Sequence, residues 1–110
     1  WDNWDIDDSA NGWHCDVRTS FSEDWDNWDV DDYTSGWHAD VRTSFSEDWD
    51  DWDIDFDGGD LDARTAFSGD WDNWDVSGDF PASTPLEYRI AVLFVPVITN
   101  VMIQNGIITP

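Results

Sequence analysis

Residues 1–24 read WDNWDIDDSANGWHCDVRTSFSED, and residues 25–48 repeat them almost letter for letter as WDNWDVDDYTSGWHADVRTSFSED. Residues 49–70 form a third, shorter copy, WDDWDIDFDGGDLDARTAFSGD, and a partial fourth copy covers 71–80. Self-similarity with a period of about two dozen residues indicates a repeat architecture. The sequence therefore predicts an acidic Trp/Asp repeat region over 1–80, followed by an apolar, β-rich segment over 81–110.

Each copy alternates apolar and polar side chains. In the first copy Trp13, Cys15 and Val17 fall on one side of an extended chain, while His14 and Asp16 fall on the other. A period of two with β-branched and aromatic residues predicts a half-buried strand. The first half of each copy alternates more briefly, and turn residues separate the two halves at Asn11-Gly12, Ser35-Gly36 and Gly58-Gly59. The predicted fold class is all-β, built from strand–turn–strand repeats.

Two architectures fit such repeats. In a β-solenoid each copy is one coil, and equivalent residues stack about 4.8 Å apart. In an antiparallel meander or sandwich each copy is a hairpin that pairs with the next hairpin. The near-identity of the first two copies favours the solenoid, because stacked identical segments form aromatic ladders. The meander remains the alternative.

The C-terminal segment has a different composition. After Arg89 the chain reads IAVLFVPVITNVMIQNGIITP, without a charge. Its length would admit a membrane-spanning helix, but Pro96, Asn100 and the excess of β-branched residues favour strands that are buried on both faces. We expect such a strand either to fold back or to be donated to a neighbouring subunit. The predicted assembly residues are Ile90, Val92, Phe94, Val97, Val101 and Ile103.

Composition restricts the partners and the chemistry. There are 26 acidic residues against four Arg and no Lys, which gives a net charge of −22. Phosphate contacts need Lys and Arg, so nucleic acid is excluded as a partner and cations are expected. The single Cys15 cannot form an intramolecular disulfide, and Ala39 at its equivalent position indicates a small buried residue. Ser and Thr recur at interchangeable positions without a unique catalytic set, so we expect no enzyme.

Regularly spaced aspartates suggest a cation site. Asp53, Asp55, Asp57 and Gly58 match the first half of an EF-hand loop, but Arg64 stands where its final Glu belongs. We therefore predict a simpler carboxylate site for Ca²⁺; the alternative is a solvated strand face. The candidate ligands are Asp5, Asp7, Asp29, Asp31, Asp53, Asp55 and Asp57.

Two histidines offer a further hypothesis. His14 and His38 occupy equivalent positions beside Asp16 and Asp40. If equivalent residues stack, these histidines and aspartates form a candidate site for a transition metal ion. Solvated histidines that face outward are the alternative.

A Trp-x-x-Trp spacing opens every copy. It resembles the acceptor pattern for C-mannosylation of secreted proteins, and Trp is also a common platform for sugar rings. The alternative is a packed aromatic ladder, because Trp contributes a large buried area. The candidate glycosylation or carbohydrate residues are Trp1, Trp4, Trp25, Trp28, Trp49, Trp52, Trp71 and Trp74.

These patterns favour a structural function. We expect a self-assembling subunit of an extracellular or cell-surface fibre or matrix, joined through the C-terminal strand, with an anionic exterior that binds cations. The start at Trp1 suggests a processed chain or a fragment. The alternative is a monomeric module that binds Ca²⁺ or carbohydrate. Expected partners are copies of the same chain, divalent cations and, in the alternative, glycans; a membrane partner is the third hypothesis.

Overall fold

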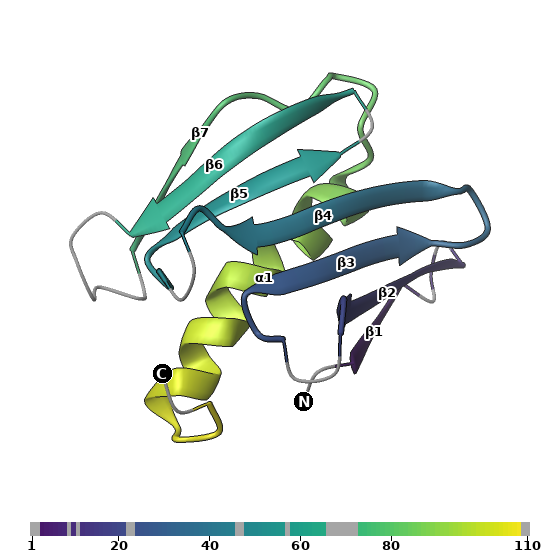
Figure 1. Ribbon diagram of the computed structural model, residues 1–110. Coiled ribbons are helices and arrows are strands. Elements are labelled where there is room, and N and C mark those ends of the chain that lie inside the picture. Colours follow the sequence, from purple (N-terminus) through teal and green to yellow (C-terminus); the bar gives the residue numbers. More distant parts are fainter. Residues whose placement is uncertain are drawn as a thin grey trace.

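A seven-stranded antiparallel sheet followed by one long helix makes up the part of the chain that the computed structural model describes, which is residues 3–8, 10, 12–21, 24–45, 48–56, 58–65 and 73–108 (Figure 1). The strands lie side by side in chain order, so the sheet is a meander. The elements are β1 (Asn3–Asp8), β2 (Trp13–Thr19), β3 (Asn27–Asp32), β4 (Trp37–Thr43), β5 (Asp51–Phe56), β6 (Gly59–Thr65), β7 (Trp74–Ser77) and α1 (Leu86–Gln104).

Successive hairpins pair edge to edge instead of stacking as coils. Val17 of β2 lies opposite Val30 of β3, and both strands run antiparallel. The favoured solenoid is therefore wrong, and the meander alternative is correct. Short turns explain the outcome: Gly12 and Gly36 adopt positive φ angles of 67° and 80°, which reverse the chain within a few residues. The sheet is open, with β1 and β7 at its two edges.

The predicted C-terminal strand is also wrong, because residues 86–104 form α1. Residues Tyr88, Val92, Val95, Thr99 and Met102 are buried, and their spacing of three or four is that of a helix. Burial of this stripe against the sheet outweighs the β-propensity of the individual residues. Since the segment is a helix that packs against its own sheet, it does not act as a strand donated to a neighbour.

A proline lies inside α1, and two polar side chains just beyond it bond back to the helix backbone. Pro96 has no backbone N–H and would be expected to weaken the helix at this point. Just beyond it, the Thr99 hydroxyl donates to the Val95 carbonyl at 2.8 Å, and Asn100 Nδ2 donates to the Pro96 carbonyl at 2.8 Å. The missing N–H of Pro96 would have bonded the Val92 carbonyl, so these two bonds do not replace it but link the following turn to the helix backbone.

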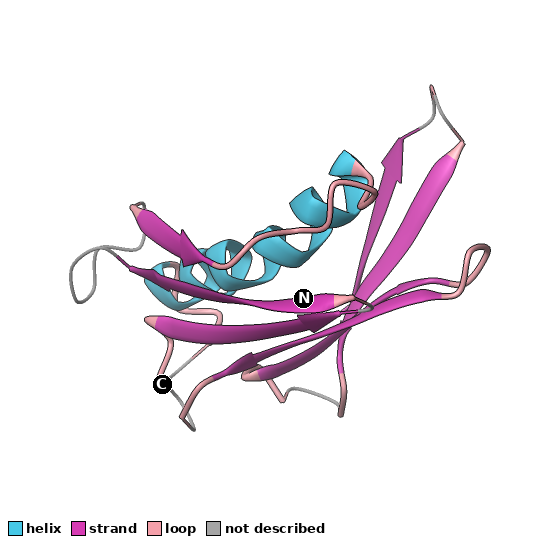
Figure 2. Cartoon of the chain, turned by 90° about the horizontal axis from the view of Figure 1, so that it is seen from above, coloured by secondary structure: helices cyan, strands magenta, loops and turns pink. Residues whose placement is uncertain are grey.

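The core lies between α1 and one face of the sheet (Figure 2). Its fully buried strand residues include Val17, Trp28 and Ile54, and those of the helix include Ala91 and Val95. Cys15 is also buried, and this burial raises the pKa of its thiol to about 12, so it is an inert core residue. The sheet therefore has one apolar face under the helix and one face that is open to solvent.

The Trp-x-x-Trp spacing has a structural role. Trp28 Nε1 donates to the Trp25 carbonyl at 2.7 Å, and Trp52 Nε1 donates to the Trp49 carbonyl at 2.8 Å. Trp28 and Trp52 thus fill the core while the indole N–H of each is bonded to the turn that precedes its strand. Asn100 of α1 also donates to the Trp49 carbonyl, at 2.9 Å, so the same turn holds the helix.

Tyr88 fixes the start of α1 over the β3–β4 hairpin. Its hydroxyl donates to Asp32 at 2.6 Å and lies 2.7 Å from the Ser35 hydroxyl, while its ring stacks on Trp37 at 4.3 Å. Asp32 also accepts the Thr34 backbone N–H at 2.9 Å. Burial alone would raise the pKa of Asp32, but these donors outweigh it and hold the pKa below its usual value. The buried carboxylate is therefore ionised, and it accepts hydrogen bonds from Tyr88 and from the turn of the hairpin.

Candidate metal centre

The solvent face of the sheet carries rows of aspartate. In β3, Trp28 and Val30 point into the core, so Asp29 and Asp31 point outward. The strand register places aspartates of neighbouring strands directly opposite one another, and like charges in this position destabilise a sheet. Such a face favours bound cations or protons. The opposed pairs are Asp5–Asp16, Asp16–Asp31, Asp29–Asp40, Asp40–Asp55, Asp53–Asp62 and Asp55–Asp60.

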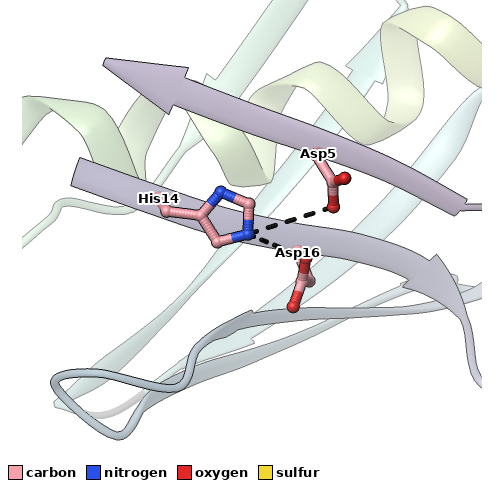
Figure 3. A group of neighbouring side chains, drawn as sticks. All are labelled: Asp5, His14 and Asp16. Atoms are coloured by element: carbon pink, nitrogen blue, oxygen red, sulfur yellow. Dashed lines mark hydrogen bonds and ion pairs between the residues drawn. The ribbon is translucent and has the colours of Figure 1, made fainter. Parts of the chain in front are cut away.

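A histidine sits between two opposed aspartates in the first hairpin. Asp5 of β1 and His14 and Asp16 of β2 converge on the solvent face (Figure 3). His14 Nε2 lies 3.1 Å from Asp16 Oδ1 and 4.0 Å from Asp5 Oδ1. The other ring nitrogen, Nδ1, bonds to Asp7. Asp7 thereby fixes the ring so that Nε2 faces the two carboxylates.

The second hairpin repeats this arrangement. His38 Nε2 lies 3.0 Å from Asp40 Oδ1, and His38 Nδ1 lies 2.6 Å from Asp31 Oδ1. Asp29 completes the group, and in each hairpin the three ligand atoms lie within 4.8 Å of one another. The second group is less exposed than the first, and His38 and Asp40 line an open hollow of about 210 Å³. The two hairpins thus provide two copies of one ligand set.

A carboxylate that holds Nδ1 of a histidine is a common partner of metal-binding histidines, because it fixes the ring and raises the basicity of Nε2. Ligands bound to Zn²⁺ at 2.0–2.1 Å in a tetrahedron lie about 3.3 Å apart. The 3.1 Å and 4.0 Å separations around His14 Nε2 therefore need only small side-chain movements to receive an ion. The two aspartates and one imidazole would leave a coordination position open to water.

Only some of the predicted Ca²⁺ ligands belong to the two Asp–His–Asp groups. Asp5 and Asp29 are in the groups, but Asp7 and Asp31 bind histidine nitrogens instead. Aspartates two residues apart on one strand point the same way without converging, so the ligand pairs form across strands. The predicted Ca²⁺ ligands omitted Asp16 and Asp40, whereas the transition-metal hypothesis placed these two residues beside His14 and His38, where the structure also has them.

The third hairpin lacks the histidine. Asp60 occupies its position, opposite Asp55, and Asp53 lies opposite Asp62. Two candidate Ca²⁺ ligands are engaged in other contacts, since Asp53 accepts the Ser44 hydroxyl at 3.1 Å and Asp55 pairs with Arg42 at 3.0 Å. The remaining candidate, Asp57, lies outside the described residues.

Crowded carboxylates hold protons more tightly. A hydrogen bond shared with Asp16 is the main cause that raises the pKa of Asp5, while burial and a bond with Asp40 raise that of Asp29. The bond to Asp7 raises the pKa of His14. Burial alone would lower the pKa of His38, but hydrogen bonds to Asp31 and Asp40 outweigh it and raise the value. These groups therefore bind protons more tightly than isolated side chains of the same type do.

Stability should increase when the pH is lowered, in contrast to many proteins. Bonds with Asp26 raise the pKa of Asp24 to about 6, and bonds with Asp53 raise that of Asp62. From pH 4 to 6 the folded chain then binds more protons than the unfolded chain, so the free energy of unfolding falls as the pH rises through this window. Asp32, with a lowered pKa, opposes the trend only at lower pH.

Thermal unfolding in EDTA checks this prediction. We expect the Tm at pH 5 to exceed that at pH 7.5, and a net gain of about 1 kcal/mol would raise it by about 4–8 °C. The Asp24→Asn variant should show a smaller difference. A Tm that decreases steadily from pH 7.5 to pH 5 would contradict the prediction.

The predicted sugar platforms that the structure describes lie in the core or pack against it. Trp28 and Trp52 are fully buried, so neither exposes a ring face to a sugar. Trp4, Trp25, Trp49 and Trp74 are partly buried and pack against the core. Trp1 and Trp71 lie outside the described residues.

The predicted assembly residues are spread around α1. Val92 is fully buried, and Phe94, Val101 and Ile103 are partly buried. Ile90 and Val97 are 55% and 40% exposed, and Val97 lines a pocket with Trp74 and Val76 of β7. The predicted assembly residues therefore divide into a buried group and an exposed group. The prediction of a strand did not make this division.

No protein-family model matches this chain, and neither a curated protein nor a solved structure matches it. The function therefore has to be argued from the residues themselves.

Proposed function

We propose that the protein is a divalent-metal-binding module with two equivalent sites on the open face of its sheet. The observation that carries the proposal is the repeated, oriented histidine: Nδ1 is held by one aspartate, and Nε2 faces two others on neighbouring strands. The sites are Asp5–His14–Asp16 and Asp29–His38–Asp40. Bound cations would also relieve the repulsion between directly opposed carboxylates.

The ligand chemistry favours Zn²⁺ or a similar transition metal ion over the Ca²⁺ expected from the aspartate spacing. Ca²⁺ takes six to eight oxygen ligands, whereas each site offers one imidazole and two carboxylates. Zn²⁺ accepts nitrogen and oxygen together in sites of four ligands, with water as the fourth. Because His14 and His38 carry raised pKa values, binding at Nε2 would release protons.

Calorimetric titration of the full chain with Zn²⁺ at pH 7.5 tests the proposal. We expect two ions per chain, with the less exposed second site binding more tightly. His38→Asn should remove one site, and His14→Asn with His38→Asn should remove both. Asp31→Asn should leave the ligands in place but weaken the second site by about 10–100-fold, because it releases Nδ1.

Asp60→Asn is the matched control, since it changes the equivalent position of the third hairpin and removes a charge without touching a histidine. Its stoichiometry should stay at two. Zn²⁺ binding that persists in the double histidine variant would refute the proposed sites. Tighter binding of Ca²⁺ than of Zn²⁺ would instead support the all-carboxylate interpretation of the same face.

A second candidate is the expected subunit of an extracellular fibre or matrix. The open sheet favours it, because β1 and β7 are edge strands and an edge can pair with a strand of another chain. Electron microscopy of the metal-free and Zn²⁺-loaded samples separates the two functions. Filaments would favour the fibre, and dispersed particles would favour the binding module.

A further inference from the structure

The outer edge of β1 lacks a neighbour that the equivalent strands have. The four copies of the repeat begin with β1, β3, β5 and β7, and the sheet order places β2, β4 and β6 before the last three of them. Among the described residues no strand pairs with the corresponding side of β1, which forms one end of the sheet in Figure 1. Such an edge presents backbone N–H and C=O groups that a further strand can bond.

Side chains of β1 are more exposed than their equivalents inside the sheet. Trp28 and Trp52 have no exposed surface, whereas Trp4, at the same position of the first copy, is partly exposed. The side chain of Asp31 is 16% exposed, and that of its equivalent Asp7 is 63% exposed. Since β2 lies beside β3, a strand placed beside β1 in the same way would cover the equivalent side chains of β1.

An arginine is also missing at this edge. The strand register places an Arg directly opposite the central aspartate of each later copy, in the pairs Arg18–Asp29, Arg42–Asp53 and Arg64–Asp75. Asp5 is the equivalent aspartate of β1, and no described residue lies opposite it on the outer side. Opposite charges on neighbouring strands stabilise a sheet. The edge of β1 therefore suits a strand that brings an Arg to Asp5.

We propose that the outer edge of β1 binds an extended segment of a partner protein that carries an Arg, in the register that β2 adopts beside β3. In that register the Arg lies opposite Asp5, and the residue after it, a Thr in all three internal examples, lies opposite Trp4. Backbone bonds then supply affinity, and these side chains supply specificity. The strands of this pattern within the fold, β2, β4 and β6, are each paired on both sides already.

The backbone pattern identifies which N–H groups of the segment bond to β1. Ser44 N donates to the Asp51 carbonyl of β5 at 2.9 Å. Because bonds alternate along an antiparallel strand, the Arg42 N–H also points toward β5, and the Val41 N–H points toward β3. A segment that sits beside β1 as β4 sits beside β5 therefore uses the N–H of its Arg. A segment that completed a hairpin with β7 would use the N–H of its Val instead.

Fluorescence anisotropy of a labelled peptide with the full chain in EDTA tests the proposal. The probe is residues 37–45 with capped ends, whose one Asp and one Arg leave no net charge when its His is neutral. We expect saturable binding. N-methylation of the Arg42 amide should weaken it about tenfold, because a backbone hydrogen bond is lost and a methyl group faces β1, whereas N-methylation of the Val41 amide should change it by less than about twofold.

Substitutions in the protein locate the bound peptide. Asp5→Asn should weaken binding by about threefold, the size of an exposed charge pair, and should have little effect on a peptide with Arg42→Gln. Asp75→Asn is the matched control, since this aspartate of β7 is exposed and already lies opposite Arg64. Circular dichroism should show that both variants fold, because the Asp5 side chain is 65% exposed.

Three results would overturn the proposal. They are a peptide that does not bind saturably, binding that is insensitive to Asp5→Asn, and binding that is weakened by methylation at Val41 but not at Arg42, which would place the peptide on β7. Since EDTA keeps metal ions out of the measurement, none of these results bears on the metal-binding function proposed above.

Discussion

Replacing Trp52 with alanine should destabilise the protein by about 3–5 kcal/mol, the range for a large aromatic side chain removed from a core. Trp52 has no exposed surface, packs beneath α1 with the core cluster and donates its indole N–H to the Trp49 carbonyl at 2.8 Å. The substitution therefore leaves a cavity and removes the bond that holds the turn before β5. The loss is a large share of the 5–15 kcal/mol that stabilises a typical domain.

Urea unfolding followed by circular dichroism measures this loss. Phe45→Ala is a control at an aromatic residue of the same repeat region that is 73% exposed, and its effect should stay within about 0.5 kcal/mol. Equal losses for the two variants would show that Trp52 is not a core residue. The alternation that defines the two faces of the sheet would then be misassigned.

Removing the Tyr88 hydroxyl should cost about 1.5–3 kcal/mol, the range for hydrogen bonds to a charged group. Tyr88→Phe keeps the ring that stacks on Trp37 but deletes the donor to Asp32, whose carboxylate is only 6% exposed. The carboxylate would remain buried with fewer donors, so its pKa should rise toward its usual value. The start of α1 would lose its strongest polar link to the β3–β4 hairpin.

Tyr33→Phe provides the matched comparison, because Tyr33 is 62% exposed and lies in the same hairpin turn. Both variants should be measured by urea unfolding at pH 7, where Asp32 is ionised. If Asp32→Asn is introduced first, Tyr88→Phe should cost less, since the charged acceptor is gone. An unchanged cost in that background would mean that the hydroxyl acts through Ser35 instead.

Part of the candidate site follows from the sequence and part does not. The alternation of Asp and His with core residues already places Asp29, Asp31 and His38 on one face. Which of them meet depends on the register across the turn, which brings Asp31 beside His38 and Asp29 beside Asp40. The aspartate spacing within a strand suggests Ca²⁺, whereas pairing across strands brings an imidazole nitrogen close to carboxylate oxygens.

The C-terminal segment shows the limit of composition. Ile, Val and Thr favour strands when considered singly, and their number in 90–110 predicts a strand. The helical spacing of Tyr88, Val92, Val95, Thr99 and Met102 was present in the same letters. This spacing stabilises a helix only when a face of the sheet is available to bury the apolar stripe.

By itself, the sequence determined that this chain alternates an apolar and an anionic face over short strands separated by turns, because a period of two and turn residues are local properties. The tertiary structure decided three other features: the antiparallel order of the hairpins, the helical form of residues 86–104 and the partners of each histidine. These depend on contacts between residues far apart in the chain. Such contacts release free energy only when both surfaces meet, so no local pattern can specify them.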